Sequence, residues 1–389
     1  MIRTSHLLLR KSSYSALVYT LEICRQLYNA ALEQRILAYR RQRVSLSFYD
    51  QCKDLTALRA ADPEYRALSA VMTRLTVLHR LDRAMKAFFR RCKTGQKPGF
   101  PRFKGKGRFD TLVFGGQDWK IRGQKIHLHS IGTFRFTGSV RREGTLKGLR
   151  IKRVADRWEV QVLVDIGVAP AVRPAVDGVG IDVGIKTFAT LSNGERVGHP
   201  RFLKKLLDEL KTIQKCLSSK KRGSNRRQKA KTALQRLHRR IANRRRDFLH
   251  QTSRALVNQY DGFAVEALDI EQMMQQSPDD MSSRQARGLH RGIMDSAWST
   301  FIFYLAYKAE EAGKPVVRVD PKGTSQRCSD CGTVVRKGLR VREHACPACG
   351  LVLDRDENAA RNIYDLGWRS ADNPGGCTTG HQDSCGGPR

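Results

Sequence analysis

Two pairs of cysteines near the carboxyl end constrain the fold of this chain more than any other feature. Cys328 and Cys331 form one pair, Cys346 and Cys349 form the second, and 14 residues separate the pairs. Zinc favours four thiolates in a tetrahedron, and two tight turns that each carry a Cys-x-x-Cys pair bring four sulfur atoms to one ion. A glycine follows each pair directly, where such a turn often needs left-handed backbone. The pattern therefore predicts a structural Zn²⁺ site.

The other cysteines and a nearby histidine give weaker signals. Six further cysteines are scattered along the chain, which indicates free thiols in a reducing compartment and not a disulfide framework. His344 lies close to the second pair and is an alternative zinc ligand, although a lone histidine is more often a surface residue. A redox dithiol is the other alternative, but two matched pairs argue against it.

Three acidic residues lie in segments that predict two strands and a helix. In residues 179–184 (Val-Gly-Ile-Asp-Val-Gly), apolar side chains occupy one face, and Asp182 lies between two glycines on the other. Those glycines predict open space above the carboxylate for a metal ion and a phosphate. Glu266 lies in a second strand segment, and Asp356 lies in the first turn of a helix, where the helix dipole tolerates negative charge.

Carboxylates in separate elements can converge on one face of a sheet. Three of them can hold two Mg²⁺ or Mn²⁺ ions roughly 3.5–4 Å apart, and hard cations prefer such oxygen ligands. Each segment also has another interpretation. The 179–184 motif also occurs in sugar-kinase and actin-like folds, and Glu266 could form a salt bridge at the end of a strand. Asp356 could cap the helix, although we assign the cap to Asp354. The order of the acids, with the cysteine pairs between the second and third, favours a metal site.

The charge of the chain predicts a polyanionic partner. Lys and Arg total 72 against 37 acidic residues, a net charge of +35, and self-repulsion of that size calls for nucleic acid. On charge alone a ribosomal or chromatin-like binder remains open. Residues 201–258 predict a helical hairpin, and positions 201–250 carry 18 basic and 3 acidic residues. A purely structural hairpin would balance its charges, so we predict a nucleic-acid-binding face.

The amino-terminal part predicts helices followed by strands. Apolar spacing indicates helices over 14–41 and 67–91, and Gly, Pro and basic residues with interleaved Phe make 93–108 a loop suited to a nucleic-acid strand. Alternation of period two from 111 to 168 indicates a small β-barrel, with a hairpin turned at 155–157. The predicted nucleic-acid contacts in the loop and the basic hairpin are Arg102, Lys104, Lys106, Arg226, Arg227, Arg239, Arg240, Arg244 and Arg245.

The motifs together resemble the TnpB (OrfB) family of RNA-guided endonucleases carried by bacterial insertion sequences. The matching blocks are Gly-Ile-Asp182-Val-Gly, Val-Glu266-Ala-Leu, Gly-Thr-Ser-Gln-Arg-Cys328 and Asp-Arg-Asp356-Glu-Asn-Ala-Ala-Arg-Asn-Ile. The resemblance runs from near residue 1 to about 368. It implies that Asp182, Glu266 and Asp356 form the catalytic triad, that a guide RNA from the transposon end pairs with the target strand of a double-stranded DNA, and that the protein reads a short adjacent motif. Glu357 adds an acid beside the third position.

The fold that this resemblance implies is α/β: an RNase H-like (RuvC) nuclease domain with a zinc ribbon insertion, and an amino-terminal β-barrel wedge with an inserted helical recognition lobe. No apolar run reaches membrane-spanning length, so we expect a cytoplasmic protein without a membrane partner, and a monomer. The expected wedge covers residues 1–12 and 109–170, and the recognition lobe covers 13–108. The expected nuclease domain covers 176–320 and 351–368, with the basic hairpin at 201–258. The zinc ribbon is expected at 321–350 and a disordered tail at 369–389.

Two other functions fit the same scaffold. One is a cleavage-silent, RNA-guided repressor, which the presence of all three acids argues against. The other is a transposase that joins DNA strands with three RNase H-like acids, which the zinc ribbon before the last acid argues against on family resemblance. The sequence thus predicts a DNA endonuclease with structural Zn²⁺ and catalytic Mg²⁺ or Mn²⁺.

Overall fold

The computed structural model describes residues 1–10, 14–140, 144–275, 282–338 and 341–369. The chain divides into two compact units, Met1–Val168 and Ala169–Arg389, and each is described by itself. The tail predicted at 369–389 lies, apart from its first residue, outside the described residues. None of the helices in the described ranges combines the length and the apolar composition that crossing a bilayer requires.

The first unit is built on one antiparallel sheet, as the period-two alternation predicted. Its strands are β1 (Ile2–Leu9), β2 (Thr111–Gly115), β3 (Trp119–Arg122), β4 (Lys125–Leu128), β5 (Gly132–Thr137), β6 (Thr145–Val154) and β7 (Arg157–Asp165). They lie in the order β2-β6-β7-β1-β5-β4-β3. The predicted hairpin is confirmed, because Val154 pairs with Arg157 across a turn in which Ala155 has φ of 56°. The edge strands β2 and β3 are consecutive and joined by the short η2 (Gly116–Asp118), so the sheet curls back on itself.

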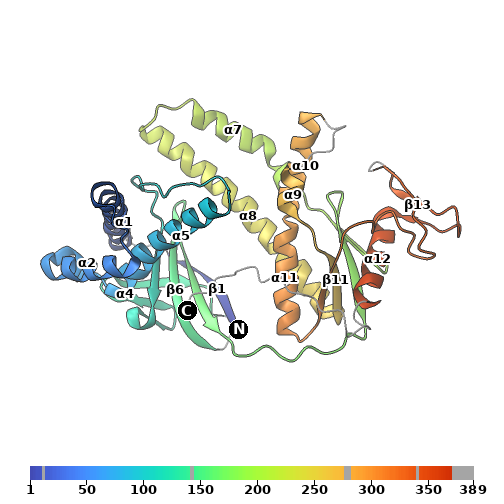
Figure 1. Cartoon of the computed structure of the whole chain (residues 1–389), viewed down its shortest axis with the longest axis horizontal. Helices are drawn as coiled ribbons and strands as arrows, with labels where there is room; N and C mark the ends of the chain where they lie inside the picture. Colours follow the sequence, from blue (N-terminus) through green and yellow to red (C-terminus); the bar gives the residue numbers. More distant parts are fainter. Residues whose placement is uncertain (11–13, 141–143, 276–281, 339–340, 370–389) are drawn as a thin grey trace. The chain divides into compact units, whose positions relative to one another are not determined.

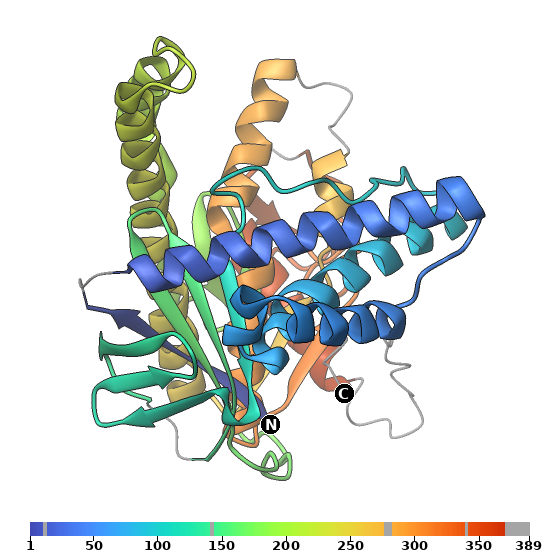
Figure 2. The ribbon, with the colours of Figure 1, turned by 90° about the vertical axis from the view of Figure 1, so that its left-hand side faces the viewer.

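Helices pack against this sheet in one continuous core (Figure 2). They are α1 (Ser15–Gln42), α2 (Phe48–Ala61), α3 (Pro63–Ala67), α4 (Ala70–Thr73), η1 (Arg74–Leu78) and α5 (His79–Lys93). The expected 14–41 helix is confirmed by α1. The expected 67–91 helix begins later and contains a π-helical turn, η1, where the Thr76 hydroxyl accepts a hydrogen bond from the Val113 amide at 2.8 Å. Bonding to β2 thus accompanies the local widening of the helix.

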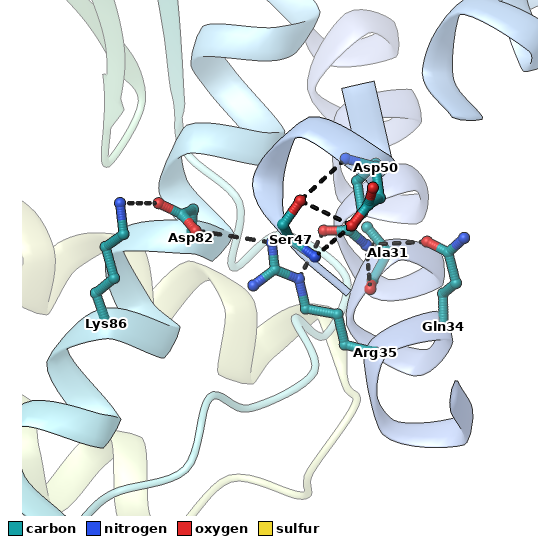
Figure 3. Close-up of polar contacts among 8 residues, drawn as sticks. Ala31, Gln34, Arg35, Ser47, Asp50, Asp82 and Lys86 are labelled. Atoms are coloured by element: carbon teal, nitrogen blue, oxygen red, sulfur yellow. Dashed lines mark hydrogen bonds and ion pairs between the residues drawn. The ribbon is translucent and has the colours of Figure 1, made fainter. Parts of the chain in front are cut away.

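A buried polar network joins three of these helices (Figure 3). Arg35 of α1 donates from Nε to Gln51 Oε1 of α2 at 2.7 Å, and its Nη2 lies 3.8 Å from Asp82 Oδ1 of α5. Gln51 in turn donates to the carbonyl oxygen of Ala31 at 2.8 Å. Lys86 pairs with Asp82 at 2.9 Å. Burial lowers the pKa of the Arg35 guanidinium, and the nearby Asp82 charge opposes that shift.

The second unit contains a five-stranded sheet of mixed direction. Its strands are β8 (Gly178–Val183), β9 (Thr187–Leu191), β10 (Arg196–Gly198), β11 (Gly262–Glu266) and β12 (Val316–Val319), in the order β10-β9-β8-β11-β12. The pairs β10–β9 and β9–β8 are antiparallel, whereas β8–β11 and β11–β12 are parallel. A separate antiparallel pair, β13 (Glu343–Ala345) and β14 (Val352–Asp354), follows in the chain. The α/β class predicted from the sequence is confirmed.

Helices cover both faces of the five-stranded sheet. The face with Val179 and Ile181 packs against α8 (Asn225–Gln259) and α11 (Trp298–Glu311). The opposite face, with Ala264 and Val319, packs against Ile363 of α12 (Arg355–Arg369). In Figure 1, α11 and α12 accordingly lie on opposite sides of β11. The remaining helices are α6 (Phe202–Lys205), α7 (Leu207–Ser218), α9 (Ile270–Gln275) and α10 (Ser283–Ser296).

The basic hairpin predicted at 201–258 is formed by α7 and α8. Leu210, Leu237 and Ile241 are buried between the two helices, at the spacing the sequence predicted. Ser224 caps α8 by accepting a hydrogen bond from the Arg227 amide at 3.2 Å. The hairpin therefore has a narrow apolar seam, and most of its basic side chains face outward.

Candidate active site and four-cysteine site

The three predicted acids lie where two strands and one helix end or begin. Asp182 is the second-last residue of β8, Glu266 is the last residue of β11, and Asp356 is the second residue of α12. In the parallel pair, Val265 lies opposite Ile181, so continuing that register places Glu266 beside Asp182 on the same face of the sheet. It is also the face that α12 covers.

Small residues bring α12 close enough to the sheet to place Asp356 near the other acids. A Cβ atom at Gly180 would lie 2.2 Å from the Ala360 carbonyl oxygen and 2.6 Å from the Tyr364 amide nitrogen. A Cβ atom at Gly178 would similarly overlap the Trp368 ring. Helix backbone therefore fills the space beside Gly180, which the sequence predicted to be open, while Asp182 itself keeps part of its surface exposed. The glycine allows a close approach of helix and strand instead.

The acids influence one another electrostatically. Burial, together with the negative charges of Glu266 and Asp356, raises the pKa of Asp182 well above its ordinary value. Burial also raises the pKa of Glu266, while a hydrogen bond that its Oε1 accepts from the Thr324 hydroxyl at 2.6 Å opposes the rise. All three residues keep part of their surface in contact with solvent. Like charges gathered in a partly desolvated place are stabilised by cations.

Neighbouring side chains hold the third acid and its helix terminus. Asp354 accepts a hydrogen bond from the Asp356 amide at 2.9 Å, which confirms it as the predicted cap of α12. Arg342 Nη1 lies 3.5 Å from Asp356 Oδ1, and this arginine is half exposed. Glu357, the adjacent acid, pairs with Arg361 at 2.8 Å. The charge of Asp356 contributes to the raised pKa of Asp182, whereas Glu357 is paired with an arginine on its own helix.

The carboxylates are more widely spaced than the thiols. Among the described residues, the four cysteines form the one group of three or more possible ligand atoms that all lie within 4.8 Å of one another. Two ions roughly 3.5–4 Å apart can share ligands across a longer span, so the acids can serve such a pair without meeting at one point. Carboxylate oxygens fit Mg²⁺ or Mn²⁺ by their chemistry.

The four cysteines converge as the sequence predicted. The Sγ atoms of Cys328 and Cys349 lie 3.6 Å apart, and those of Cys331 and Cys346 lie 3.5 Å apart. Four thiolates about 2.3 Å from one zinc ion would be separated by about 3.8 Å in a regular tetrahedron. Hydrogen bonds to Thr333 lower the pKa of the Cys331 thiol to about 6. The donor set and its spacing fit zinc.

Both cysteine pairs lie on the same kind of turn. The Gly332 amide donates to the Cys328 carbonyl oxygen at 3.0 Å, and the Gly350 amide donates to that of Cys346 at the same distance. The two glycines have φ of 77° and 76°, the left-handed backbone that the sequence predicted. His344, expected at the surface, is instead completely buried on β13, and its Nδ1 contacts Lys337 Nζ.

Several predicted nucleic-acid contacts have partners within the fold. Arg227 Nη1 donates to the carbonyl oxygens of Leu217 and Lys220 at 2.7 and 2.8 Å, which closes the α7–α8 turn. Arg245 pairs at 2.7 Å with Asp295, whose side chain is buried on α10. The Lys104 ammonium lies 5.6 Å from the centre of the Tyr28 ring in the first unit.

Other predicted contacts face solvent. Arg240 is half exposed and pairs with Glu209 of α7. Arg102, Lys106, Arg226 and Arg244 are exposed. Arg239, which is partly buried, also has an interaction of its own. Local spacing thus identified the basic segments, but it did not separate arginines that hold the hairpin together from arginines available to a partner.

Three polar residues near the acids had no role predicted from the sequence: Thr324, Asn358 and Asn362. Asn358 is completely buried, and each of the other two is 5% exposed. A signal for the asparagines was present, because they lie four residues apart inside a helix, where Asn is unfavourable unless its amide has a specific partner.

A cavity of about 420 Å³ that includes Ile185, Arg201 and Arg291 in its lining also lies in this unit. That cavity is not lined by the three acids.

Comparison with known proteins places these residues in matched segments. The family model OrfB_IS605, described as a probable transposase, matches residues 161–277, which include Asp182 and Glu266. The Cas12f1-like TNB domain model matches residues 298–363, which include the four cysteines and Asp356. In the solved structure of a Cas12f1–sgRNA–target DNA complex, a chain 15% identical aligns over 90% of this chain and 82% of its own length with a TM-score of 0.53. That likeness shows a shared fold.

One curated relative aligns over most of the chain, and others align over shorter stretches. A protein of Escherichia coli (strain K12) named "Putative RNA-guided DNA endonuclease InsQ" is 33% identical over 294 residues, which are 74% of this chain and 72% of the relative. CRISPR-associated endodeoxyribonuclease Cas12f1 of Sulfoacidibacillus thermotolerans is 51% identical over 61 residues, 15% of this chain and 14% of the relative. Three proteins of Acanthamoeba polyphaga mimivirus named TnpB-like are 28% identical over 198 residues. By its long alignment with InsQ and the OrfB_IS605 match, this chain belongs to the TnpB (OrfB) family.

Proposed function

We propose that this chain is a divalent-metal-dependent DNA endonuclease that a bound guide RNA directs to its target. The observation that carries the proposal is the electrostatic coupling of Asp182 with Glu266 and Asp356 at the ends of β8, β11 and α12. Three partly desolvated acids repel one another unless cations are present, and a net charge of +35 suits nucleic acid. The names of the relatives, which include RNA-guided DNA endonucleases, support the same function.

The two sheets and the cysteine turns also support a division into domains. The mixed five-stranded sheet with α12 on one face supports an RNase H-like (RuvC) nuclease domain over 176–320 and 351–368, and the paired cysteine turns support a zinc ribbon over 321–350. The curled sheet supports a β-barrel wedge over 1–12 and 109–170, with the helices at 13–108 as the recognition lobe.

Asp182, Glu266 and Asp356 would hold two Mg²⁺ or Mn²⁺ ions through their carboxylate oxygens. When bound, such ions supply Lewis acidity that activates water and stabilises the leaving oxygen of the phosphodiester. The residues orient this chemistry: Glu266 is fixed by Thr324, and Asp356 is fixed by the cap at the start of α12. Arg342, half exposed beside Asp356, is positioned to contact a backbone phosphate when the carboxylate binds metal.

The outward basic side chains of the α7–α8 hairpin and of the 93–108 loop would hold the RNA or the RNA–DNA duplex. The exposed residues Arg226 and Arg244 carry this role on α8, and Arg102 and Lys106 carry it in the loop. Contacts of this kind follow backbone phosphates and are independent of sequence. Base pairing with the guide then supplies sequence specificity.

The test is purification of the full chain with any RNA it retains, followed by sequencing of that RNA. A guide reprogrammed on this scaffold is then assayed for cleavage of plasmid DNA that carries a matched target next to a library of adjacent motifs, with Mg²⁺ present. We expect cut plasmid with the wild-type chain and intact plasmid with Asp182→Ala. Intact plasmid with the wild-type chain across the whole library would overturn the proposal.

The same experiment separates the two rival functions. A repressor would lower expression of a reporter with the matched target equally in the wild type and in Asp182→Ala, without any cut product. A strand-joining transposase would join DNA ends in the absence of RNA. Either result, obtained with RNA-loaded protein that leaves matched DNA intact, would replace the endonuclease assignment.

A further inference from the structure

Three buried polar side chains connect the four-cysteine site to the acids. Asn358 of α12 accepts a hydrogen bond from the Ser329 amide at 2.9 Å and donates to the Arg327 carbonyl oxygen at 2.7 Å. These two backbone groups flank Cys328, which is itself 1% exposed. The side chain of Asn358 therefore holds the first cysteine turn against α12 through hydrogen bonds to the backbone on both sides of Cys328.

Asn362, one helical turn further along α12, holds the segment that precedes the same cysteine. Its amide donates to the carbonyl oxygens of Thr324 and Arg327 at 2.8 and 2.7 Å. Backbone bonds from the Gln326 and Arg327 amides to the Gly323 carbonyl oxygen, both at 3.0 Å, keep this segment in a tight turn. Residues 323–329 are thus fixed to α12 by side-chain amides and not by a continuous strand.

The same turn reaches the second acid directly. The Thr324 hydroxyl donates to Glu266 Oε1 at 2.6 Å, and Thr324 is almost completely buried. Asp356 lies two residues before Asn358 on α12. The segment 323–329 is therefore hydrogen-bonded to the Glu266 carboxylate through Thr324. It is also hydrogen-bonded to α12, the helix that carries Asp356, and it contains the zinc-ligand candidate Cys328.

We infer that Thr324, Asn358 and Asn362 are positioning residues that set Glu266 and Asp356 for divalent-ion binding, with the Cys328 turn as their anchor. The inference rests on the proposed function and extends it, because it assigns the four-cysteine site a second role as support for the acids. Residues that orient metal ligands typically change metal affinity by about 10–100-fold when removed.

If Thr324, Asn358 and Asn362 served only to stabilise the fold, their replacement would have a different effect. Buried amides that only stabilise the fold would lower the free energy of unfolding when replaced, without changing the affinity of the folded protein for divalent ions. Positioning residues change that affinity while the fold and the bound zinc are retained. Thr324 distinguishes the positioning role from the structural role best, because Thr324→Val keeps the shape of the side chain and removes only its hydrogen-bond donor.

The experiment compares the wild type with Thr324→Val, Thr324→Ser and Thr137→Val in the full chain. Thr137, whose hydroxyl donates to the Leu8 carbonyl oxygen at 3.2 Å, undergoes the same chemical change in the first unit and is the matched control. Mn²⁺ binding is measured by electron paramagnetic resonance without nucleic acid, alongside zinc content and thermal unfolding. Guided cleavage is then measured as a function of Mg²⁺ concentration.

We expect Thr324→Val to weaken Mn²⁺ binding by about 10-fold or more while it retains its zinc. Its cleavage rate should approach that of the wild type at saturating Mg²⁺. Thr324→Ser should restore most of the affinity, and Thr137→Val should match the wild type. Asn362→Ala, as a second variant, should weaken Mn²⁺ binding in the same direction and increase amide exchange at residues 324–329.

Equal Mn²⁺ affinity in the wild type, Thr324→Val and Asn362→Ala would overturn the inference and leave the endonuclease function standing. Loss of affinity that Thr324→Ser does not restore would also overturn it, since the hydroxyl would then not be the cause. A wild-type chain that binds Mn²⁺ but never cuts guided targets would overturn the proposed function, while the Thr324 comparison would still decide the positioning role.

Discussion

The two units of this protein both bury polar networks, but the networks differ in charge. Around Arg35 in the first unit, a guanidinium lies between a glutamine and an aspartate, so positive and negative groups balance one another. Around Asp182 in the second unit, the neighbours that act on its pKa most strongly after burial are two further acids. Buried polarity alone therefore does not mark a functional site. A cluster in which charges of one sign predominate is a stronger indication of a functional site, because a bound cation would stabilise it.

The units also differ in what holds them together. The helices of the first unit join through an apolar core and the Arg35 network. The segment that carries the four cysteines has two short strands of three residues each, too little to be stable alone. It relies on the cysteine site and on the amides of Asn358 and Asn362. Substitutions in both units test this difference.

Cys328→Ser should have the largest effect, because structural zinc sites contribute on the order of 10 kcal/mol to the folding of small metal-bound segments. We expect loss of zinc and rapid amide exchange over residues 324–354, with protection in β1–β7 unchanged, as measured by hydrogen exchange and mass spectrometry. Cys216→Ser, at an exposed cysteine of α7, is the control. Full protection of residues 324–354 without zinc would contradict the metal dependence of this segment.

Arg35→Ala should lower the free energy of unfolding of the first unit by about 3 kcal/mol, because it leaves buried polar partners uncompensated. Urea denaturation followed by a probe in the first unit measures this. Arg35→Met, which keeps the length without the charge, tests whether the pairing or the packing matters. Mn²⁺ affinity should be unchanged in both variants, and a change there would mean that the Arg35 network is not purely architectural.

Asp182→Asn should stabilise the metal-free protein by about 0.5–2 kcal/mol, the size of a common stabilising substitution, because it removes one of the mutually repelling charges. The raised pKa of Asp182 means that the folded state binds its proton more tightly than the unfolded chain does. The free energy of unfolding of the wild type therefore falls as pH rises from the ordinary carboxyl range through the raised pKa. Thermal unfolding between pH 4 and 8 should show that fall reduced in Asp182→Asn. A variant less stable than the wild type at neutral pH would contradict it.

Arg226→Ala and Arg244→Ala should have the smallest effect on the fold and a measurable effect on RNA binding. Each removed phosphate contact should lower the slope of log affinity against log salt by about 0.7. The control is Arg227→Ala, which removes the bonds that close the α7–α8 turn and should lower thermal stability more than the salt slope. Identical behaviour of Arg226 and Arg227 would show that the internal bonds of Arg227 do not matter.

Local spacing determined much of this protein from the sequence alone. The Cys-x-x-Cys pairs with their glycines predicted two matched turns, and the period-two and helical patterns predicted the β6–β7 hairpin, α1 and the α7–α8 hairpin. Each depends on contacts between residues close in the chain, and local geometry follows directly from residue type and spacing. The segments that carry the acids were found for the same reason.

How those segments meet depends on packing between residues far apart in the chain. Gly180 lies against the backbone of α12, and Arg245, a predicted nucleic-acid contact, pairs with Asp295, 50 residues away. The bond from Thr324 to Glu266 joins residues 58 positions apart. Side-chain type states what a residue can bond to, but across such separations the partner is set by how helices and strands pack, which no local pattern encodes.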